Sequence, residues 1–132
     1  YPLMTMIFTM PGIPMIYSGQ ETKLVKKLEF FEKDEIDWLD FPNHEFYKSL
    51  INLRKSENAF WQYNSSIKFL NGLPSGLVGY KRVYETQVCY VLLNLTSQNI
   101  PIKINQMNNS ILFKDKKSDL NFIAPYGFLV HK

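Results

Sequence analysis

The periodicity of the apolar residues changes near Asn58, and this change constrains the fold more than any other feature of the sequence. Before Asn58, apolar residues occur in long runs or at helical spacing, whereas after it they occur in short alternating runs separated by Gly, Asn, Ser and Pro. The charge changes at the same place: residues 1–58 hold nine acids and seven bases, and residues 59–132 hold three acids and eight bases. Both observations predict two units, 1–58 and 59–132.

The first unit predicts a helix, a tight connection and a buried strand. Apolar residues recur at helical spacing over residues 2–10, and Pro11-Gly12 ends that pattern. Residues 14–18 form a short apolar run bounded by Pro14 and Gly19, which is typical of a strand buried on both faces of a parallel sheet. Helix, connection and strand together would be half of a βα repeat.

A long loop and a second helix follow. Residues 20–42 are charged and aromatic without a sustained period, which predicts a loop, and long loops are often functional. Asn43 is placed to cap a helix over residues 43–55. That helix has an apolar face and carries Arg54 and Lys55 in its last turn, where positive charge suits the helix dipole.

The second unit predicts an all-β domain. Its runs are rich in β-branched and aromatic residues and are separated by turn residues such as Asn71-Gly72 and Asn108-Asn109. The predicted strands cover residues 67–70, 77–84, 88–96, 100–104, 110–113 and 122–131. Six short strands at this spacing indicate an antiparallel sandwich or barrel.

Composition excludes several classes of function. The chain is 45% apolar and 15% aromatic, which is typical of a globular protein rather than of disorder. A net charge of +3 is too weak to indicate nucleic acid as a partner. The apolar stretch 2–17 contains three prolines and a glycine and has no basic residue before it, so it predicts neither a membrane span nor a secretory signal.

Cysteine and histidine are too few for a metal site or an internal disulfide. The chain has one cysteine, Cys89, and two histidines. We therefore expect no cofactor and no bound metal. The chain also begins at Tyr1 with residues that already have the pattern of a core helix, from which we expect it to be the C-terminal piece of a longer protein.

A resemblance to a known family is carried by residues 9–21, whose sequence is TMPGIPMIYSGQE. This stretch resembles the last barrel strand of the alpha-amylase family of glycoside hydrolases, family 13. The resemblance continues in three further stretches: FFEKDEIDW at 30–38, FYKSLINLRK at 46–55 and IAPYGFLV at 123–130. They resemble, in order, the loop after strand eight, the last barrel helix and the closing strand of the family's C-terminal β-domain.

The resemblance covers nearly the whole chain and implies an α+β arrangement. Residues 1–58 would be the C-terminal end of a (β/α)8 TIM barrel, contributing its last strand and helix, and 59–132 an antiparallel β-sandwich domain. The parent enzyme would be a retaining alpha-glucosidase or alpha-amylase acting on α-glucosidic linkages of starch or maltodextrin. Its partners would be an α-glucan or maltooligosaccharide and the rest of the barrel, in a cytoplasmic or an exported bacterial enzyme.

The family's catalytic carboxylates lie at the ends of earlier strands, so the resemblance implies no catalytic residue in this chain. We expect the 132 residues alone to be inactive. Glu21 follows the end of the predicted strand, at the rim where such barrels carry out their chemistry. It could support the rim through hydrogen bonds or contact substrate directly. Trp38 could hold its loop against the barrel or stack on a sugar ring.

Two other features predict structure rather than chemistry. The acidic residues of 29–40 could suggest calcium, but the EF-hand spacing is absent and a solvated loop held to the barrel by Phe30, Phe31 and Trp38 fits better. The sequence Asn43-His44-Glu45 is similar to the family's Asn-His-Asp signature. It differs in the acid and stands at a helix start, which favours capping.

Two alternative functions remain open. A non-catalytic carbohydrate-binding domain would need several exposed, coplanar aromatic residues in the second unit. The candidates are Trp61, Tyr63, Tyr80, Tyr84, Tyr90 and Tyr126. A structural or interaction domain would need another chain to cover the apolar residues 3–17, and we expect self-association of the isolated chain for that reason.

Overall fold

The computed structural model describes residues 1–103 and 110–132, which form a helical layer against an antiparallel sheet. The helices are α1 (Pro2–Thr9), α2 (His44–Ser56) and α3 (Asn58–Trp61). The strands are β1 (Ser66–Phe69), β2 (Leu77–Tyr84), β3 (Gln87–Asn94), β4 (Ile100–Pro101), β5 (Ile111–Lys114), β6 (Phe122–Ile123) and β7 (Phe128–His131). None of the described helices is long and apolar enough to cross a membrane.

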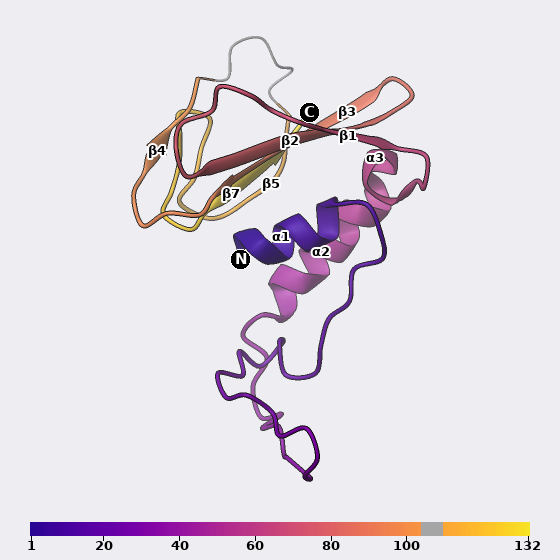
Figure 1. Cartoon of the computed structure of the whole chain (residues 1–132), viewed down its shortest axis with the longest axis vertical. Coiled ribbons are helices and arrows are strands. Elements are labelled where there is room, and N and C mark those ends of the chain that lie inside the picture. The colour runs from indigo at the N-terminus through magenta and orange to yellow at the C-terminus, as the bar shows by residue number, and fades with distance from the viewer. Residues whose placement is uncertain (104–109) are drawn as a thin grey trace.

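The strands form one five-stranded sheet in the order β1-β2-β3-β7-β5 and one two-stranded ribbon of β4 and β6. Every pair is antiparallel, and a bulge interrupts the β5–β7 pair between Ile111 and Phe113. The predicted α+β class and antiparallel sheet are confirmed. Among the described residues, the second layer of the predicted sandwich is a ribbon of two short strands, and the helices cover the other face of the large sheet (Figure 1).

Two of the predicted strands were too long. Residues 122–131 form two strands instead of one, because a turn follows Ala124 in which Tyr126 has φ 50° and the Gly127 amide donates to the Ala124 carbonyl at 2.9 Å. The strand predicted over residues 100–104 ends at Pro101 among the described residues. Residue 104 and the Asn108-Asn109 turn lie outside them.

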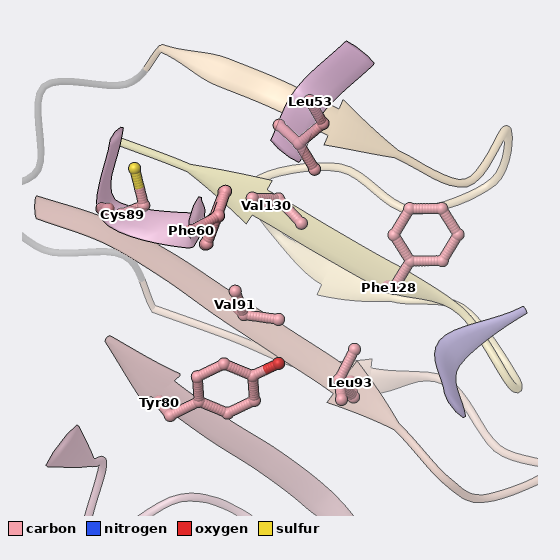
Figure 2. Packing of buried hydrophobic residues seen from close by; sticks show 9 residues of the cluster. Leu53, Phe60, Tyr80, Cys89, Val91, Leu93, Phe128 and Val130 are labelled. Carbon is pink, nitrogen blue, oxygen red and sulfur yellow. The ribbon is translucent and has the colours of Figure 1, made fainter. Parts of the chain in front are cut away.

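The helix-facing side of the sheet holds the main core (Figure 2). Side chains from alternate positions of β2, β3 and β7 meet side chains from α2 and α3 there. The cluster consists of Leu53, Ala59, Phe60, Tyr80, Cys89, Val91, Leu93, Phe128 and Val130. Since Leu53 belongs to α2 and Val91 to β3, this core crosses the predicted boundary near Asn58.

The opposite face of the sheet packs against the β4–β6 ribbon. Leu92 and Leu129, which are register partners in β3 and β7, lie against Ile100 and Ile123 of the ribbon. Asn94 is fully buried at the edge of this layer, where its side-chain amide donates to the carbonyl oxygens of residues 98, 123 and 124. These bonds hold the ribbon against the end of β3.

Residues 14–18 are not a strand, contrary to the sequence prediction. They follow α1 as an extended segment without ladder partners among the described residues, and Met15 and Tyr17 are 69% and 59% exposed. The physical reason is that a strand buried on both faces of a parallel sheet needs neighbouring strands, and the seven strands described pair only with one another. The predicted helices, in contrast, are confirmed as α1 and α2.

Candidate functional site

The C-terminal end of α1 leads into the extended segment 14–18, which is part of the stretch 9–21 that carries the family resemblance. The last carbonyl groups of an α-helix have no partner within the helix, and the partial negative charge of the helix dipole lies there. Arg54 from α2 donates to the Phe8 carbonyl oxygen at 2.8 Å and also to the Gly12 carbonyl oxygen. Arg82 from β2 donates to the Thr9 carbonyl oxygen at 2.6 Å. Two guanidinium groups from different parts of the chain therefore fix this turn.

Arg82 is 1% exposed, so its charged guanidinium group is almost completely removed from water. Burial, and then the positive charge of Arg54, lower the pKa of the Arg82 guanidinium. Beside it, Tyr80 Oη lies 2.5 Å from Thr9 Oγ1, and burial raises the pKa of this tyrosine to about 12. Arg82 is thus held by the Thr9 carbonyl oxygen and the Ser65 hydroxyl group, and with the Tyr80–Thr9 hydrogen bond it attaches α1 to the sheet.

Gly19 and Glu21 follow the extended segment in a tight turn. Gly19 has φ +89°, and a Cβ atom there would lie 2.8 Å from Leu24 Cδ2, so glycine is required both for conformation and for space. Leu24 donates its amide to the Gly19 carbonyl oxygen at 3.0 Å, which closes the turn.

Glu21 is half-buried beside the first turn of α2. Its carbonyl oxygen accepts a hydrogen bond from the Asn43 amide at 3.2 Å. The pKa of the Tyr47 hydroxyl is raised, first by burial and then by the negative charge of Glu21. The structure therefore brings Glu21, Asn43 and Tyr47 together at one end of the helical layer, next to a hollow of about 300 Å³ that Asn43 and Tyr47 line with Tyr1, Met4, Lys23 and Phe46.

Asn43 does not cap α2 with its side chain, so the capping interpretation is wrong in this respect. It occupies the N-cap position, but its side-chain amide donates to the Gln20 carbonyl oxygen at 2.8 Å, and its Oδ1 accepts from the Tyr1 hydroxyl at 3.1 Å. Asn43 instead ties the turn around Glu21 to the helix. No local sequence pattern predicts these bonds, because the two partners lie 23 and 42 residues away.

Trp38 lies on the same long loop, and in the part of the chain that the structure describes no hydrogen bond or ring contact joins it to Glu21. It is 47% exposed and stacks on Phe41 with ring centroids 6.1 Å apart. Phe30 and Phe31 are 88% and 92% exposed and contact each other edge to face. The expectation that these rings hold the loop against the barrel stays a prediction, since the chain spans only about a fifth to a third of the structures that it matches.

The acidic residues of the loop serve mainly to shape it. Asp34 contacts Lys26 and accepts the Glu29 amide at 3.1 Å. Asp37 and Asp40 accept the amides of Leu39 and Phe41 at 3.0 and 2.8 Å. Within residues 1–103 and 110–132, no group of three or more His, Cys, Asp or Glu residues is arranged to hold a metal ion.

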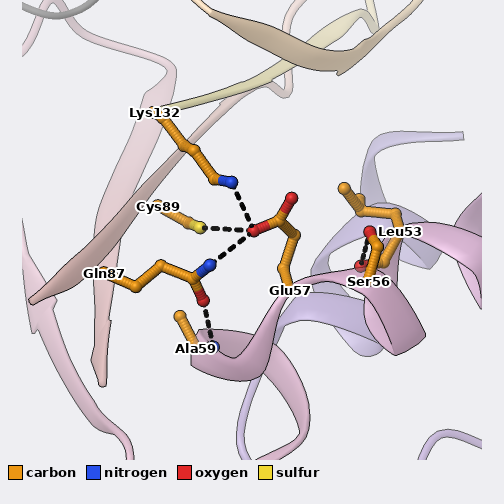
Figure 3. Close-up of polar contacts among 7 residues, drawn as sticks. All are labelled: Leu53, Ser56, Glu57, Ala59, Gln87, Cys89 and Lys132. Atoms are coloured by element: carbon orange, nitrogen blue, oxygen red, sulfur yellow. Dashed lines mark hydrogen bonds and ion pairs between the residues drawn. The ribbon is translucent and has the colours of Figure 1, made fainter. Parts of the chain in front are cut away.

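Glu57 is a buried carboxylate that the sequence analysis missed (Figure 3). It is 5% exposed at the junction of α2 and α3, where Lys132 Nζ lies 2.9 Å from its Oε2 and Gln87 donates to the same oxygen at 2.8 Å. Cys89 lies 3.9 Å away, and burial followed by the charge of Glu57 raises the pKa of its thiol to about 12. Every partner is distant in sequence. Because the oxygen is already satisfied, this cluster joins the helices to the sheet rather than offering a reactive group.

The six aromatic candidates of the second unit do not form one platform. Tyr80 is fully buried in the helix-facing core, whereas Tyr90 lies on the other face of the sheet, stacked on His131 with centroids 5.2 Å apart. Trp61 is 49% exposed on α3, and Tyr126 is 59% exposed in the turn before β7. Tyr90 and His131 line a hollow of about 410 Å³ whose other walls are mostly Leu, Pro and Ile.

No family model matches the sequence, and no curated protein matches it. Solved structures do match. The alpha-amylase from H. orenii matches with a TM-score of 0.68 at 21% identity, over 98% of this chain and 34% of that chain. An inactive double mutant of MutB in complex with isomaltulose matches with a TM-score of 0.71 at 14% identity, over 99% of this chain and 37% of that chain.

A maltogenic amylase from S. marinus matches with a TM-score of 0.65 at 25% identity, over 98% of this chain and 19% of that chain. The chain therefore spans between a fifth and about a third of the length of these structures. Nearly all of it has the fold of a part of alpha-amylase-type enzymes, and the resemblance to that family is confirmed at the level of fold.

Proposed function

We propose that this chain is the C-terminal portion of a retaining alpha-glucosidase or alpha-amylase that acts on α-glucosidic linkages of starch or maltodextrin. Residues 1–58 would complete a (β/α)8 barrel with its last strand and helix, and 59–132 would form the C-terminal β-domain. The observation that carries this proposal is the match over 98–99% of the chain to parts of an alpha-amylase, a sugar-binding MutB enzyme and a maltogenic amylase.

The distribution of exposed apolar residues supports the barrel assignment. Ile13 and Met15 are 97% and 69% exposed, and Leu3 and Ile7 on α1 are also exposed. Large apolar side chains gathered on one stretch of surface mark a face that another polypeptide covers. We assign that polypeptide to the preceding strands and helices of the barrel, beside which residues 14–18 would become the buried parallel strand that their sequence predicts.

The proposed enzyme needs catalytic carboxyl groups, which we assign to the remainder of the barrel. Retaining hydrolysis uses two carboxyl groups about 5 Å apart, one as nucleophile and one as acid and base. Glu57 is committed to Lys132 and Gln87, and the aspartates of the 29–40 loop accept backbone hydrogen bonds. The catalytic carboxylates would therefore come from the remainder of the barrel, and the 132 residues alone would be inactive.

Glu21 and Trp38 would act at the substrate side of the completed barrel. Glu21 would be a positioning residue, because its neighbour Asn43 fixes the turn that follows the proposed last strand. Trp38 offers a half-exposed indole face, and such a face packs well against the apolar side of a pyranose ring. The β-domain would hold this unit in place, since Arg82 and Tyr80 attach α1 to the sheet.

The test compares the chain with the protein encoded by the complete open reading frame around it. Both are assayed for the release of reducing ends from starch and maltoheptaose. We expect activity only in the longer protein, and we expect Glu21→Gln in that protein to lower kcat more than Glu45→Gln, a matched change at an exposed carboxylate. An open reading frame that begins near Tyr1, with glucan binding and no hydrolysis, would replace the proposal by a carbohydrate-binding or structural domain.

A further inference from the structure

The face of the sheet that packs against the β4–β6 ribbon carries a hollow of about 410 Å³. Its walls come from the loop between β1 and β2, from β3, from β7 and from the residues at and after β4. All of them belong to the second unit, whereas α1, α2 and α3 lie against the opposite face of the sheet. The hollow is therefore separate from the surfaces that we assign to contact with the remainder of the barrel. Its volume is in the range of small-molecule sites.

The lining of the hollow favours an apolar ligand over a sugar. None of the described residues that line it is Asp, Glu, Asn, Gln or Arg, the side chains that pair best with sugar hydroxyl groups. Tyr90 has one ring face covered by His131, with an interplanar angle of 9°. The remaining walls are mostly aliphatic, and their apolar residues are Leu70, Leu73, Pro74, Leu92, Pro101 and Ile102.

His131 supplies a polar group to this apolar hollow. It is 1% exposed, and its Nδ1 lies 3.3 Å from the Lys132 carbonyl oxygen. Because a carbonyl oxygen only accepts, this contact places a proton on Nδ1. No hydrogen bond within residues 1–103 and 110–132 reaches the other ring nitrogen, Nε2. A polar atom of a buried side chain without a partner costs free energy, so a ligand that pairs with Nε2 gains by doing so.

The charge around the hollow favours an anion. Lys103 lines it, is exposed, and has no carboxylate partner among the described residues. The unit 59–132 holds eight bases and three acids, which gives the whole domain a positive field. Burial lowers the pKa of His131, and its bond to the Lys132 carbonyl raises it to a lesser extent. A negative group beside the ring would raise this pKa again, so binding of an anion would take up a proton.

We propose that the hollow binds a small apolar carboxylate, with its hydrocarbon part against Leu70, Leu73 and Leu92 and its carboxylate group between His131 and Lys103. The aliphatic walls select the hydrocarbon part, and the two nitrogen groups select the charge. This site does not depend on the proposed glycosidase function and goes beyond it, since it lies on the other side of the sheet from the proposed barrel.

Saturation-transfer NMR detects binding of benzoate and octanoate to the chain, and titration calorimetry gives the affinities. We expect both acids to bind, and the neutral benzamide and maltose to bind at least about tenfold more weakly, because they lack the charge-assisted bonds. Lys103→Gln should weaken benzoate binding about threefold, the effect of an exposed charge pair. Lys116→Gln is the matched control, because Lys116 is an exposed lysine of the same domain that does not line the hollow.

The pH dependence of binding tests the role of His131. Wild-type affinity for benzoate should rise by up to about tenfold per unit as the pH is lowered from about 8 to about 6, because the imidazole is neutral in the free protein and protonated in the complex. The other titratable groups around the ring are Tyr90, Lys103 and Lys132, which ionise well above this range. From β5, the register partner of His131 is the apolar Ile111.

His131→Phe keeps a ring against Tyr90 but removes both nitrogens, so its weaker binding of benzoate should not vary over this pH range. Circular dichroism checks that this variant is folded. The Lys103→Gln comparison does not depend on that check, because Lys103 is exposed and lies outside the core clusters.

Three results would overturn the proposal. An absence of saturation transfer from both acids would show that the hollow is not free to bind them. Equal affinities in wild type, Lys103→Gln and His131→Phe would assign binding to another surface. Tighter binding of maltose than of benzoate would replace the site by a sugar-binding one. None of these results bears on the hydrolysis of starch, which the longer protein tests separately.

Discussion

Strand β3 and the extended segment 14–18 have similarly apolar sequences and opposite fates. In β3, Val91 and Leu93 are fully buried between β2 and β7, and the strand pairs along both edges. In 14–18, Met15 is 69% exposed, and the segment pairs with no strand within residues 1–103 and 110–132. The comparison teaches that an apolar run specifies burial in a sheet only if the chain also supplies its neighbours, which is why strand propensity depends on context.

The largest test of this comparison is to shorten one side chain in each region. We expect Leu93→Ala to lower the free energy of unfolding by about 2–5 kcal/mol, because it leaves a cavity in the core, whereas Met15→Ala should change it by less than about 0.5 kcal/mol. Urea denaturation followed by circular dichroism measures both. The comparison fails if the two changes lower the free energy of unfolding equally. In the longer protein, we expect Met15→Ala to become destabilising.

The next test concerns the two arginines that join the regions. Arg82→Met should lower the free energy of unfolding by about 2–3 kcal/mol, since it removes the buried donor to the Thr9 carbonyl oxygen. Arg54→Met should cost about 1 kcal/mol, because Arg54 is only partly buried and water can replace part of what it donates. Thermal unfolding of both variants checks the order. A larger effect for Arg54 would mean that the turn after α1, rather than the sheet, holds the helix.

A third test follows the pH dependence of stability that comes from the carboxylate of Asp115, the residue after β5. Burial raises the pKa of Asp115, but hydrogen bonds from Ser118, Phe128 and Lys117 outweigh it and hold the pKa below the ordinary value of 3.8. The ionised form therefore stabilises the fold above that value, and this stability disappears as the pH falls through the lower, folded pKa.

Asp115→Asn should lower the free energy of unfolding by about 1–2 kcal/mol at pH 7, because the amide cannot accept all of these bonds. Its loss of stability between about pH 5 and pH 2 should be smaller than that of wild type. Denaturant titrations across this pH range give both quantities. Parallel pH profiles for the two proteins would show that Asp115 does not carry this dependence.

The sequence predicted a helix or strand correctly where the pattern is local and the packing partners belong to the same chain. Helical spacing located α1 and α2, and the alternation with turn residues located the strands of the sheet. Residues 14–18 have no strand partner among the described residues, because the strand that their apolar pattern predicts needs neighbouring strands that this chain does not supply. The resemblance to alpha-amylases came from residues 9–21 and was confirmed as a likeness of fold.

The polar contacts around the candidate site could not be predicted. Asn43 was expected to cap its own helix, a contact over a few residues, and instead it bonds to Gln20 and Tyr1. The Glu57 cluster depends on Gln87 and Lys132, which no local pattern connects to it. Such contacts follow from the tertiary arrangement. The roles of Glu21 and Trp38 at a substrate site remain predictions for the same reason, since the surfaces they would face belong to the proposed remainder of the barrel.

The smallest effect on global stability, and the most local one, is expected in the turn around Glu21. Asn43→Ala removes the bonds that tie this turn to α2, and Gly19→Ala places a Cβ atom 2.8 Å from Leu24 Cδ2 at φ +89°. Because residues 13–41 lie outside the core clusters except for the packing of Ile16, each change should shift the free energy of unfolding by less than about 0.5 kcal/mol.

The same changes should make the loop of residues 20–42 a better protease substrate, because cleavage of a surface segment follows its local opening rather than global unfolding. Limited trypsin digestion followed by mass spectrometry measures cleavage after Lys23, Lys26 and Lys27. Ser49→Ala, which removes a hydroxyl group that bonds only within α2, should leave the rate at these sites unchanged. Equal cleavage in wild type and Asn43→Ala would mean that Asn43 does not limit the opening of the turn. The segment 14–18 would then differ from β3 in lacking fixed ends as well as strand partners.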